Sequence, residues 1–120
     1  MTTAKTHLVL SASTIAGDKV QNQDGETLGT IKELMIDTGT GRIAYAVLDF
    51  GGFLGIGNKY FAVPWPALTV STVPKCLVMD ADKEMLKSAE GFDHDHWPDF
   101  ADQHWGARIH DHYRTTPYWE

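Results

Sequence analysis

The sequence predicts a mainly β fold, a small and strongly curved antiparallel β-barrel with short C-terminal helices packed on it. Two observations lead to this fold class. Short apolar runs are separated by glycine-containing turns through the first eighty residues of a 120-residue chain, which is the size of one domain. The run from Arg42 to Phe50 is apolar on both faces, as expected of a central strand in a sheet that curls upon itself.

The first half of the chain is predicted to form β-hairpins. A strand over residues 19–22 leads into Asp24-Gly25, a dipeptide that tolerates the positive φ of a tight turn. A long strand follows from Leu28 to Asp37. Its apolar side chains change face between Ile31 and Leu34, which predicts a bulge or sharp bend near residues 32–33.

The next elements continue the sheet. Residues 38–41 form a second turn before the central strand, and a further strand runs from Asn58 to Val63. Pro64-Trp65-Pro66 ends that strand. Residues 77–80 are a candidate fifth strand.

Two helices are expected after the strands. Asp80 or Asp82 can cap a short helix that Gly91 ends. Pro98 suits the first turn of a second helix, which Gly106 would end. The apolar stripes of the two helices are predicted to be Met85, Leu86 and Ala89 in the first, and Trp97, Phe100, Ala101, His104 and Trp105 in the second.

Composition divides the chain into three parts. Residues 1–12 are expected to be a flexible N-terminal arm, residues 13–90 the barrel, and residues 91–120 a tail packed on it. The last thirty residues hold five of the six histidines and seven of the thirteen aromatic residues, and rings are stabilised by burial. No stretch is apolar enough for a secretory signal or a membrane span, so a cytoplasmic location is expected.

Charge and cysteine content exclude several classes. Ten basic and sixteen acidic residues give a formal net charge of −6, so direct binding of nucleic acid is not expected. Cys76 is the single cysteine, so no intrachain disulfide can form.

The glycine-rich loop over residues 51–57 does not match a phosphate-binding loop. Asn58 and Lys59 stand where that motif needs Lys and then Ser or Thr, and the loop joins two strands rather than a strand and a helix. Two interpretations stay open. The loop is either a flap over the barrel end, or an exposed docking patch formed by Phe53, Leu54 and Ile56.

The histidines offer a second candidate site. His94, His96, His104, His110 and His112 lie among carboxylates, which suggests a metal-binding or pH-responsive tail. No zinc motif supports a metal, so no metal site is assigned. No nucleophile motif is present either, and we expect neither an enzyme nor a bound cofactor.

Several sequence segments together resemble those of the PRC-barrel family, which is named after the cytoplasmic domain of the photosynthetic reaction-centre H subunit. The resemblance covers about residues 13–89, and it rests on Gly17-Asp-Lys-Val20, Asp24-Gly-Glu-Thr-Leu-Gly29, Ile31-Lys-Glu-Leu-Met-Ile-Asp37, Thr40-Gly-Arg-Ile-Ala-Tyr-Ala-Val-Leu48 and Phe61-Ala-Val-Pro-Trp65. The glycine loop, Gly91-Phe-Asp93, Trp97-Pro98 and Pro117-Tyr-Trp119 look like small stand-alone bacterial members. In those members a proline often precedes Gly-Phe-Asp, whereas this chain has Glu90.

The resemblance implies a curved antiparallel barrel that acts as a docking or assembly module. The sequence therefore favours a non-enzymatic protein-interaction module that self-associates, with a homodimer as the expected form. The alternatives are a ribosome or RNA-processing accessory that binds a basic protein, as one relative does, and a metal- or pH-responsive sensor. The candidate interaction surface consists of Phe53, Leu54, Ile56, Trp97, Trp105 and Trp119.

Overall fold

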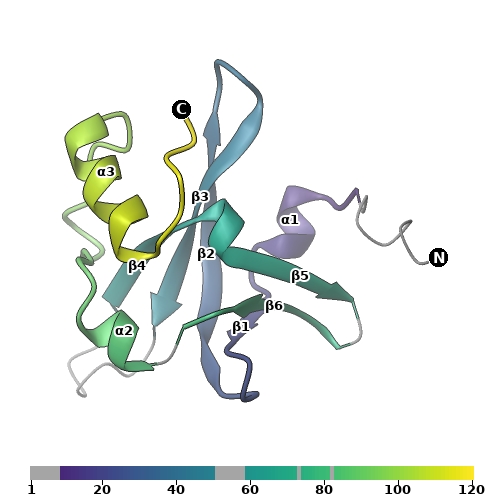
Figure 1. Cartoon of the computed structure of the whole chain (residues 1–120). Coiled ribbons are helices and arrows are strands. Elements are labelled where there is room, and N and C mark those ends of the chain that lie inside the picture. The colour runs from purple at the N-terminus through teal and green to yellow at the C-terminus, as the bar shows by residue number, and fades with distance from the viewer. Residues whose placement is uncertain (1–8, 51–58, 73, 82) are drawn as a thin grey trace.

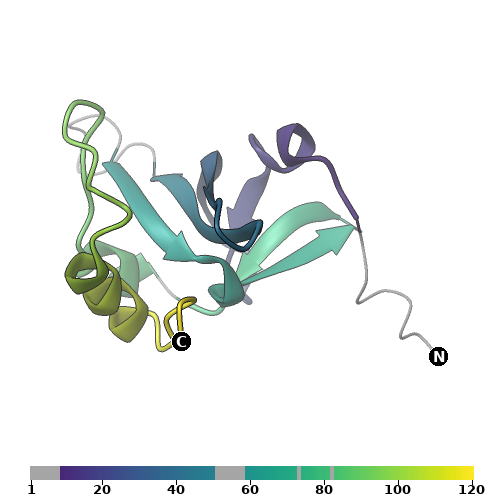
Figure 2. The same cartoon turned by 90° about the horizontal axis from the view of Figure 1, so that it is seen from above.

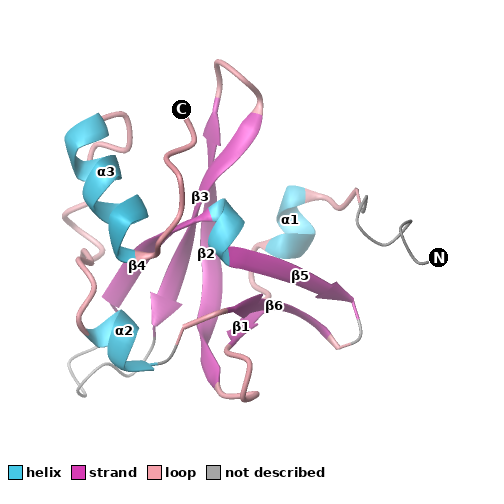
Figure 3. Ribbon diagram, in the orientation of Figure 1, coloured by secondary structure: helices cyan, strands magenta, loops and turns pink. Residues whose placement is uncertain are grey.

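A computed structural model of the chain describes residues 9–50, 59–72, 74–81 and 83–120, and six strands in this part form one sheet in the order β4-β3-β2-β1-β6-β5 (Figure 1). The strands are β1 (Lys19–Gln21), β2 (Thr27–Asp37), β3 (Arg42–Phe50), β4 (Lys59–Pro64), β5 (Leu68–Thr72) and β6 (Lys75–Met79). The helices are α1 (Ala12–Ile15), α2 (Lys83–Lys87) and α3 (Gln103–His112), with a 3-10 turn, η3 (Trp65–Ala67). Figure 3 shows how strands predominate over helices.

The mainly β class is confirmed, but the purely antiparallel pattern is wrong at one pair. β1 runs parallel to β6, with Val20 opposite Leu77, while the remaining neighbours are antiparallel. A parallel pair needs a long connection, and the chain between β1 and β6 supplies it. β4 and β5 are the two edges of the sheet, so it is open and closure of the predicted barrel is not confirmed. Seen from above, β5 and β6 lie to one side of the long hairpin and the tail to the other (Figure 2).

The β2–β3 hairpin is the longest pairing in the sheet. The register shifts between Ile31 and Glu33, which confirms the predicted bulge, and shifts again between Met35 and Ile36. The turns before β2 and before β3 contain Gly25 at φ 85° and Gly41 at φ 77°, and Asp24-Gly25 predicts the first of these.

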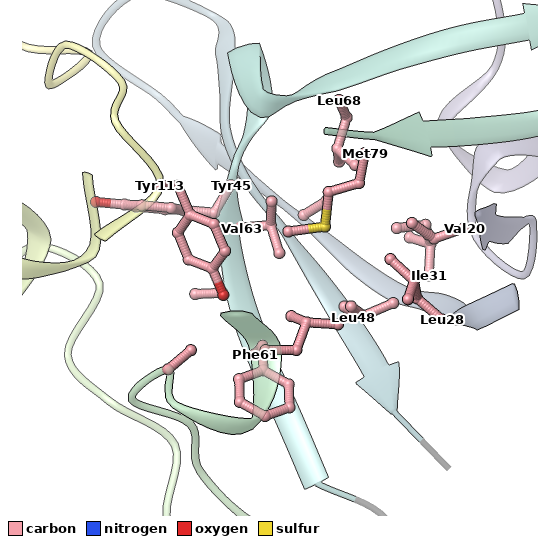
Figure 4. Packing of buried hydrophobic residues seen from close by; sticks show 14 of the residues in the cluster. Val20, Leu28, Ile31, Tyr45, Leu48, Phe61, Val63, Leu68, Met79 and Tyr113 are labelled. Carbon is pink, nitrogen blue, oxygen red and sulfur yellow. The ribbon is translucent and has the colours of Figure 1, made fainter. Parts of the chain in front are cut away.

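The core surrounds β3, where five consecutive residues from Ala44 to Leu48 are buried. Leu48 lies beside Leu28 and Ile31 of β2, while Tyr45 faces the C-terminal segment (Figure 4). This explains why β3 is apolar on both faces. Side chains on one face pack against residues of β2, and side chains on the other face pack against the C-terminal segment.

The first predicted helix corresponds to α2, but it ends at Lys87 rather than near Gly91; Leu86 is fully buried. The second predicted helix is displaced. α3 begins after Asp102 rather than at Pro98, because the Asp102 carboxylate accepts hydrogen bonds from the backbone N–H groups of His104 at 2.9 Å and Trp105 at 3.4 Å. The helix then runs through Gly106 instead of ending there.

Three elements were not predicted, namely α1, η3 and β5. α1 is a short helix within the sequence assigned to the arm and the start of the barrel, and Ser11 caps it by accepting from the Thr14 N–H at 3.2 Å. β5 follows η3 directly and pairs with β6. Residues 1–8, most of the predicted arm, lie outside the described residues.

Candidate functional site

The C-terminal segment packs on the sheet through a cluster of rings centred on Tyr45 of β3. The Tyr45 ring lies 5.3–5.8 Å, centroid to centroid, from the rings of Phe100, Trp105, His110 and Tyr118. In Figure 1, α3 and the segment that follows it lie beside β3 and β4. These ring contacts hold the C-terminal segment on the sheet.

A close approach at Gly106 fixes how α3 lies on the sheet. A Cβ atom at this position would lie 2.8 Å from the Tyr45 hydroxyl oxygen and 2.8 Å from the Trp119 ring. The glycine in the helix interior is thus required by packing, whereas the sequence alone suggested a helix end.

We expect a Gly106→Ala variant to be less stable than the wild-type protein by about 1–2 kcal/mol. Alanine favours a helix by about 1 kcal/mol over glycine, but Tyr45 is fully buried and cannot move away, so overpacking outweighs that gain. Urea unfolding followed by tryptophan emission measures the change. The control is Ala107→Gly at an exposed position of the same helix, which loses helix propensity but leaves the emission maximum of the folded state unchanged. A Gly106→Ala protein with unchanged or greater stability would contradict the close-packing explanation.

Trp97 forms the outer end of this ring cluster. Its ring lies 5.1 Å from the ring of Phe92 and 5.7 Å from that of Tyr60, and its indole N–H donates to the His94 carbonyl oxygen at 3.0 Å. The residue is nevertheless 38% exposed. An aromatic ring that is fixed by contacts on one side and exposed to solvent on the other is typical of residues that anchor a protein–protein interface.

The chain around Trp97 is acidic. Asp93, Asp95 and Asp99 are exposed. A hydrogen bond from His96 and the backbone N–H of Asp95 hold the pKa of Asp93 below its ordinary value, so this carboxylate is charged at neutral pH. We call Trp97 and these three aspartates the Trp97 surface.

The three predicted site residues that the structure describes do not form one surface. Trp105 is only 7% exposed and Trp119 is half-buried against Gly106, so both rings hold the tail on the sheet. Trp97 has the most exposed ring of the three. Phe53, Leu54 and Ile56 lie outside the described residues.

The histidines are also dispersed. His94, His96 and His104 are exposed, whereas His110 is buried and its Nδ1–H donates to the Gly106 carbonyl oxygen at 2.8 Å. His112 donates from Nε2 to the Met85 carbonyl oxygen at 3.0 Å, which ties α3 to α2. Over the described ranges, no three His, Cys, Asp or Glu side chains are grouped to hold a metal ion.

The surface also has a feature that the sequence did not predict. A groove of about 770 Å³ lies where the β1–β2 turn, β5, β6, α2 and the end of α3 meet. The β1–β2 turn and the end of α3 are far in the sequence from the other three segments, and no motif in any of the five indicated a site.

Comparison with known proteins places the fold. The PRC-barrel domain family matches residues 8–86, about two thirds of the chain, and the protein belongs to this family. The family indicated by the sequence resemblance is therefore confirmed, although the sheet in this structure is open. No curated protein matches the chain.

Among solved structures, the chain is similar to RimM from Pseudomonas aeruginosa, a protein assigned to 16S ribosomal RNA processing. The identity is 18% and the TM-score 0.43, and the match covers 67% of this chain and 49% of that chain. The similar region therefore spans about half the length of RimM. In the part of the chain that the structure describes, no helix is long and apolar enough to cross a membrane.

Proposed function

We propose that this PRC-barrel protein is a non-enzymatic protein-interaction module that docks a partner through the Trp97 surface. The exposed ring of Trp97 carries the proposal. Large apolar rings cost free energy when they stay in water, and this one is prepositioned by Tyr60 and Phe92 and by the hydrogen bond to His94. A partner that covers it loses little side-chain entropy at this residue.

Charge indicates which partner this surface suits. Asp93, Asp95 and Asp99 are exposed and lie within four residues of Trp97 in the chain, so a basic protein gains from long-range attraction. Two copies of this surface would repel each other. The partner we propose is therefore a basic protein, which retains the ribosomal or RNA-processing alternative as one version of this function.

Self-association is a second candidate, and a different feature favours it. β5 is an edge of the sheet, and its sequence Leu68-Thr-Val-Ser-Thr72 contains none of the lysine or proline residues that often protect an edge. A second copy could pair with this strand. Sedimentation velocity over a concentration series tests for it, and a monomer at all concentrations would remove this candidate.

We expect a Trp97→Ser variant to lose the partner while remaining folded. Immobilised wild-type protein and variants are compared by capture from host lysate, with the bound proteins quantified by mass spectrometry. Ile36→Ser, at another exposed apolar residue that is 48% exposed, is the matched control. A Phe53→Ser/Leu54→Ser/Ile56→Ser variant tests the glycine-loop patch in the same experiment.

The expected result is a basic protein that wild type and Ile36→Ser retain and Trp97→Ser loses at least ten-fold. Truncation of a central aromatic anchor costs about 2 kcal/mol or more, which corresponds to that loss. Equal retention by wild type and a folded Trp97→Ser variant, confirmed by circular dichroism, would show that this surface is not the docking site. Ribosomal subunits sedimented at low salt test the ribosomal version directly.

A further inference from the structure

The groove at the meeting point of sheet and tail has the form of a binding site. Its volume of about 770 Å³ is within the range of clefts that hold ligands. It is lined by Asn22, Gln23, Asp24, Pro66, Ala67, Thr69, Val78, Asp80, Ala81, Met85, Tyr113, Arg114 and Thr115.

Part of the lining of the groove is apolar. Val78 of β6, Ala81 and Met85 are half-buried, and Pro66 and Ala67 of η3 contribute the other apolar side chains. Such a surface suits the methylene stem of a long side chain, which covers apolar groups while its charged head stays at the rim.

The charge at the groove is negative. Asp24 and Asp80 are exposed, and among the described residues neither carboxylate forms an ion pair or accepts a hydrogen bond. The C-terminal end of α3 also borders the groove through Tyr113, Arg114 and Thr115, and a helix C-terminus carries partial negative charge.

Arg114 is the one basic residue among the lining residues that the structure describes. It follows α3 in the left-handed conformation at φ 58°, where glycine is usual, while the Thr115 N–H donates to the His110 carbonyl oxygen at 2.9 Å. Its guanidinium has no ion-pair partner in the described part of the chain. Two aspartates and a helix end therefore outweigh one arginine, and the groove favours a cation.

We propose that this groove binds a basic segment of a partner polypeptide, with a lysine ammonium group at Asp24 and Asp80 and its stem on Val78, Ala81 and Met85. The proposal rests on the proposed role as an interaction module, and it adds a second contact site with a defined chemistry. Charge complementarity identifies the occupant, and the apolar lining distinguishes a lysine stem from a bare inorganic cation.

Fluorescence anisotropy with a labelled peptide of alternating lysine and alanine tests the site on the full chain. We expect Asp24→Asn and Asp80→Asn each to weaken binding about two- to five-fold, the range of a single exposed charge contact. Arg114→Gln should strengthen binding about two-fold, because it removes the opposing charge. Glu33→Gln is the control, since it makes the same charge change at an exposed residue of β2 outside the groove.

The signs of these effects separate the proposal from damage to the fold, because a disrupted groove cannot bind more tightly. Equal weakening by Glu33→Gln and Asp24→Asn would show attraction by net charge alone and overturn the proposal. Tight binding of a peptide whose lysines are Nε-acetylated, or displacement by equimolar spermidine, would overturn the requirement for a lysine-bearing polypeptide.

The Trp97→Ser variant distinguishes this proposal from the function on which it rests. It should bind the lysine peptide as wild type does, because Trp97 does not line the groove. If neither wild type nor any variant bound the lysine peptide, while capture of the partner still depended on Trp97, the groove would be rejected as a binding site. The proposed role as an interaction module would then remain.

Discussion

A Gly29→Ala variant is expected to lose about 3 kcal/mol of stability or more, which is the largest effect that we expect from a Gly→Ala change at any glycine the structure describes. Gly29 lies on β2 against the central strand β3. A Cβ atom there would collide with the carbonyl oxygen of Asp49 and approach the Leu48 side chain to 3.0 Å. Backbone atoms of a central strand cannot move aside without breaking the ladder, so the clash is costly.

Chemical unfolding in urea measures this loss. The matched control is Gly39→Ala in the β2–β3 turn, where the nearest atom to an added Cβ is an Asp37 carboxylate oxygen at 3.4 Å. We expect the control to change the free energy of unfolding by less than about 0.5 kcal/mol, as exposed sites usually do. If both variants were equally stable, the close approach of β2 and β3 would be wrong.

The second large effect is a loss of stability at alkaline pH, which we expect to reach about 2–3 kcal/mol at pH 11. Tyr45 and Tyr113 are buried, and burial raises the pKa of both hydroxyls well above the ordinary value of 10.0. Between pH 10 and the higher pKa of the folded state, only the unfolded chain ionises. Each tyrosine then shifts the equilibrium towards unfolding by about 1.4 kcal/mol per pH unit, whereas below pH 10 its contribution is fully present.

Urea unfolding between pH 8 and pH 11 follows this loss, with tyrosinate absorbance as a second signal. Neither hydroxyl has a hydrogen-bond partner in the described part of the chain. Tyr45→Phe and Tyr113→Phe should therefore be close to neutral at pH 7 and should each flatten the pH dependence. A dependence that stays the same in the double variant would assign the alkaline loss to other groups.

The sequence was sufficient where local chemistry decides the structure. The bounds of β3, the glycines of the two turns and the bulge after Ile31 all follow from residue type and spacing. The resemblance identified the family, which the match over residues 8–86 confirms, whereas the closed antiparallel barrel that it implied is not confirmed.

The sequence was insufficient where contacts between segments that are distant in the chain decide the structure. Gly106 has the signature of a helix end, but the Tyr45 hydroxyl and the Trp119 ring explain its presence inside α3. β5 lacks a distinctive pattern and becomes a strand because β6 pairs with it. Among the proposed site residues, Trp97 is exposed, whereas Trp105 is buried because it packs on Tyr45 across the tail interface, a contact that no local pattern indicates. The groove draws its lining from five separate segments, which no local motif could indicate.

The parallel pairing of β1 with β6 has a consequence for synthesis of the protein. Val20 leaves the ribosome long before its partner Leu77, and at about 5–20 residues per second the delay is roughly 3–11 seconds. During that interval β1 can pair only with β2, and one of its edges stays open to other chains. The sheet is completed late, so a chaperone that shields the nascent β1–β2–β3 unit would raise the yield of folded protein.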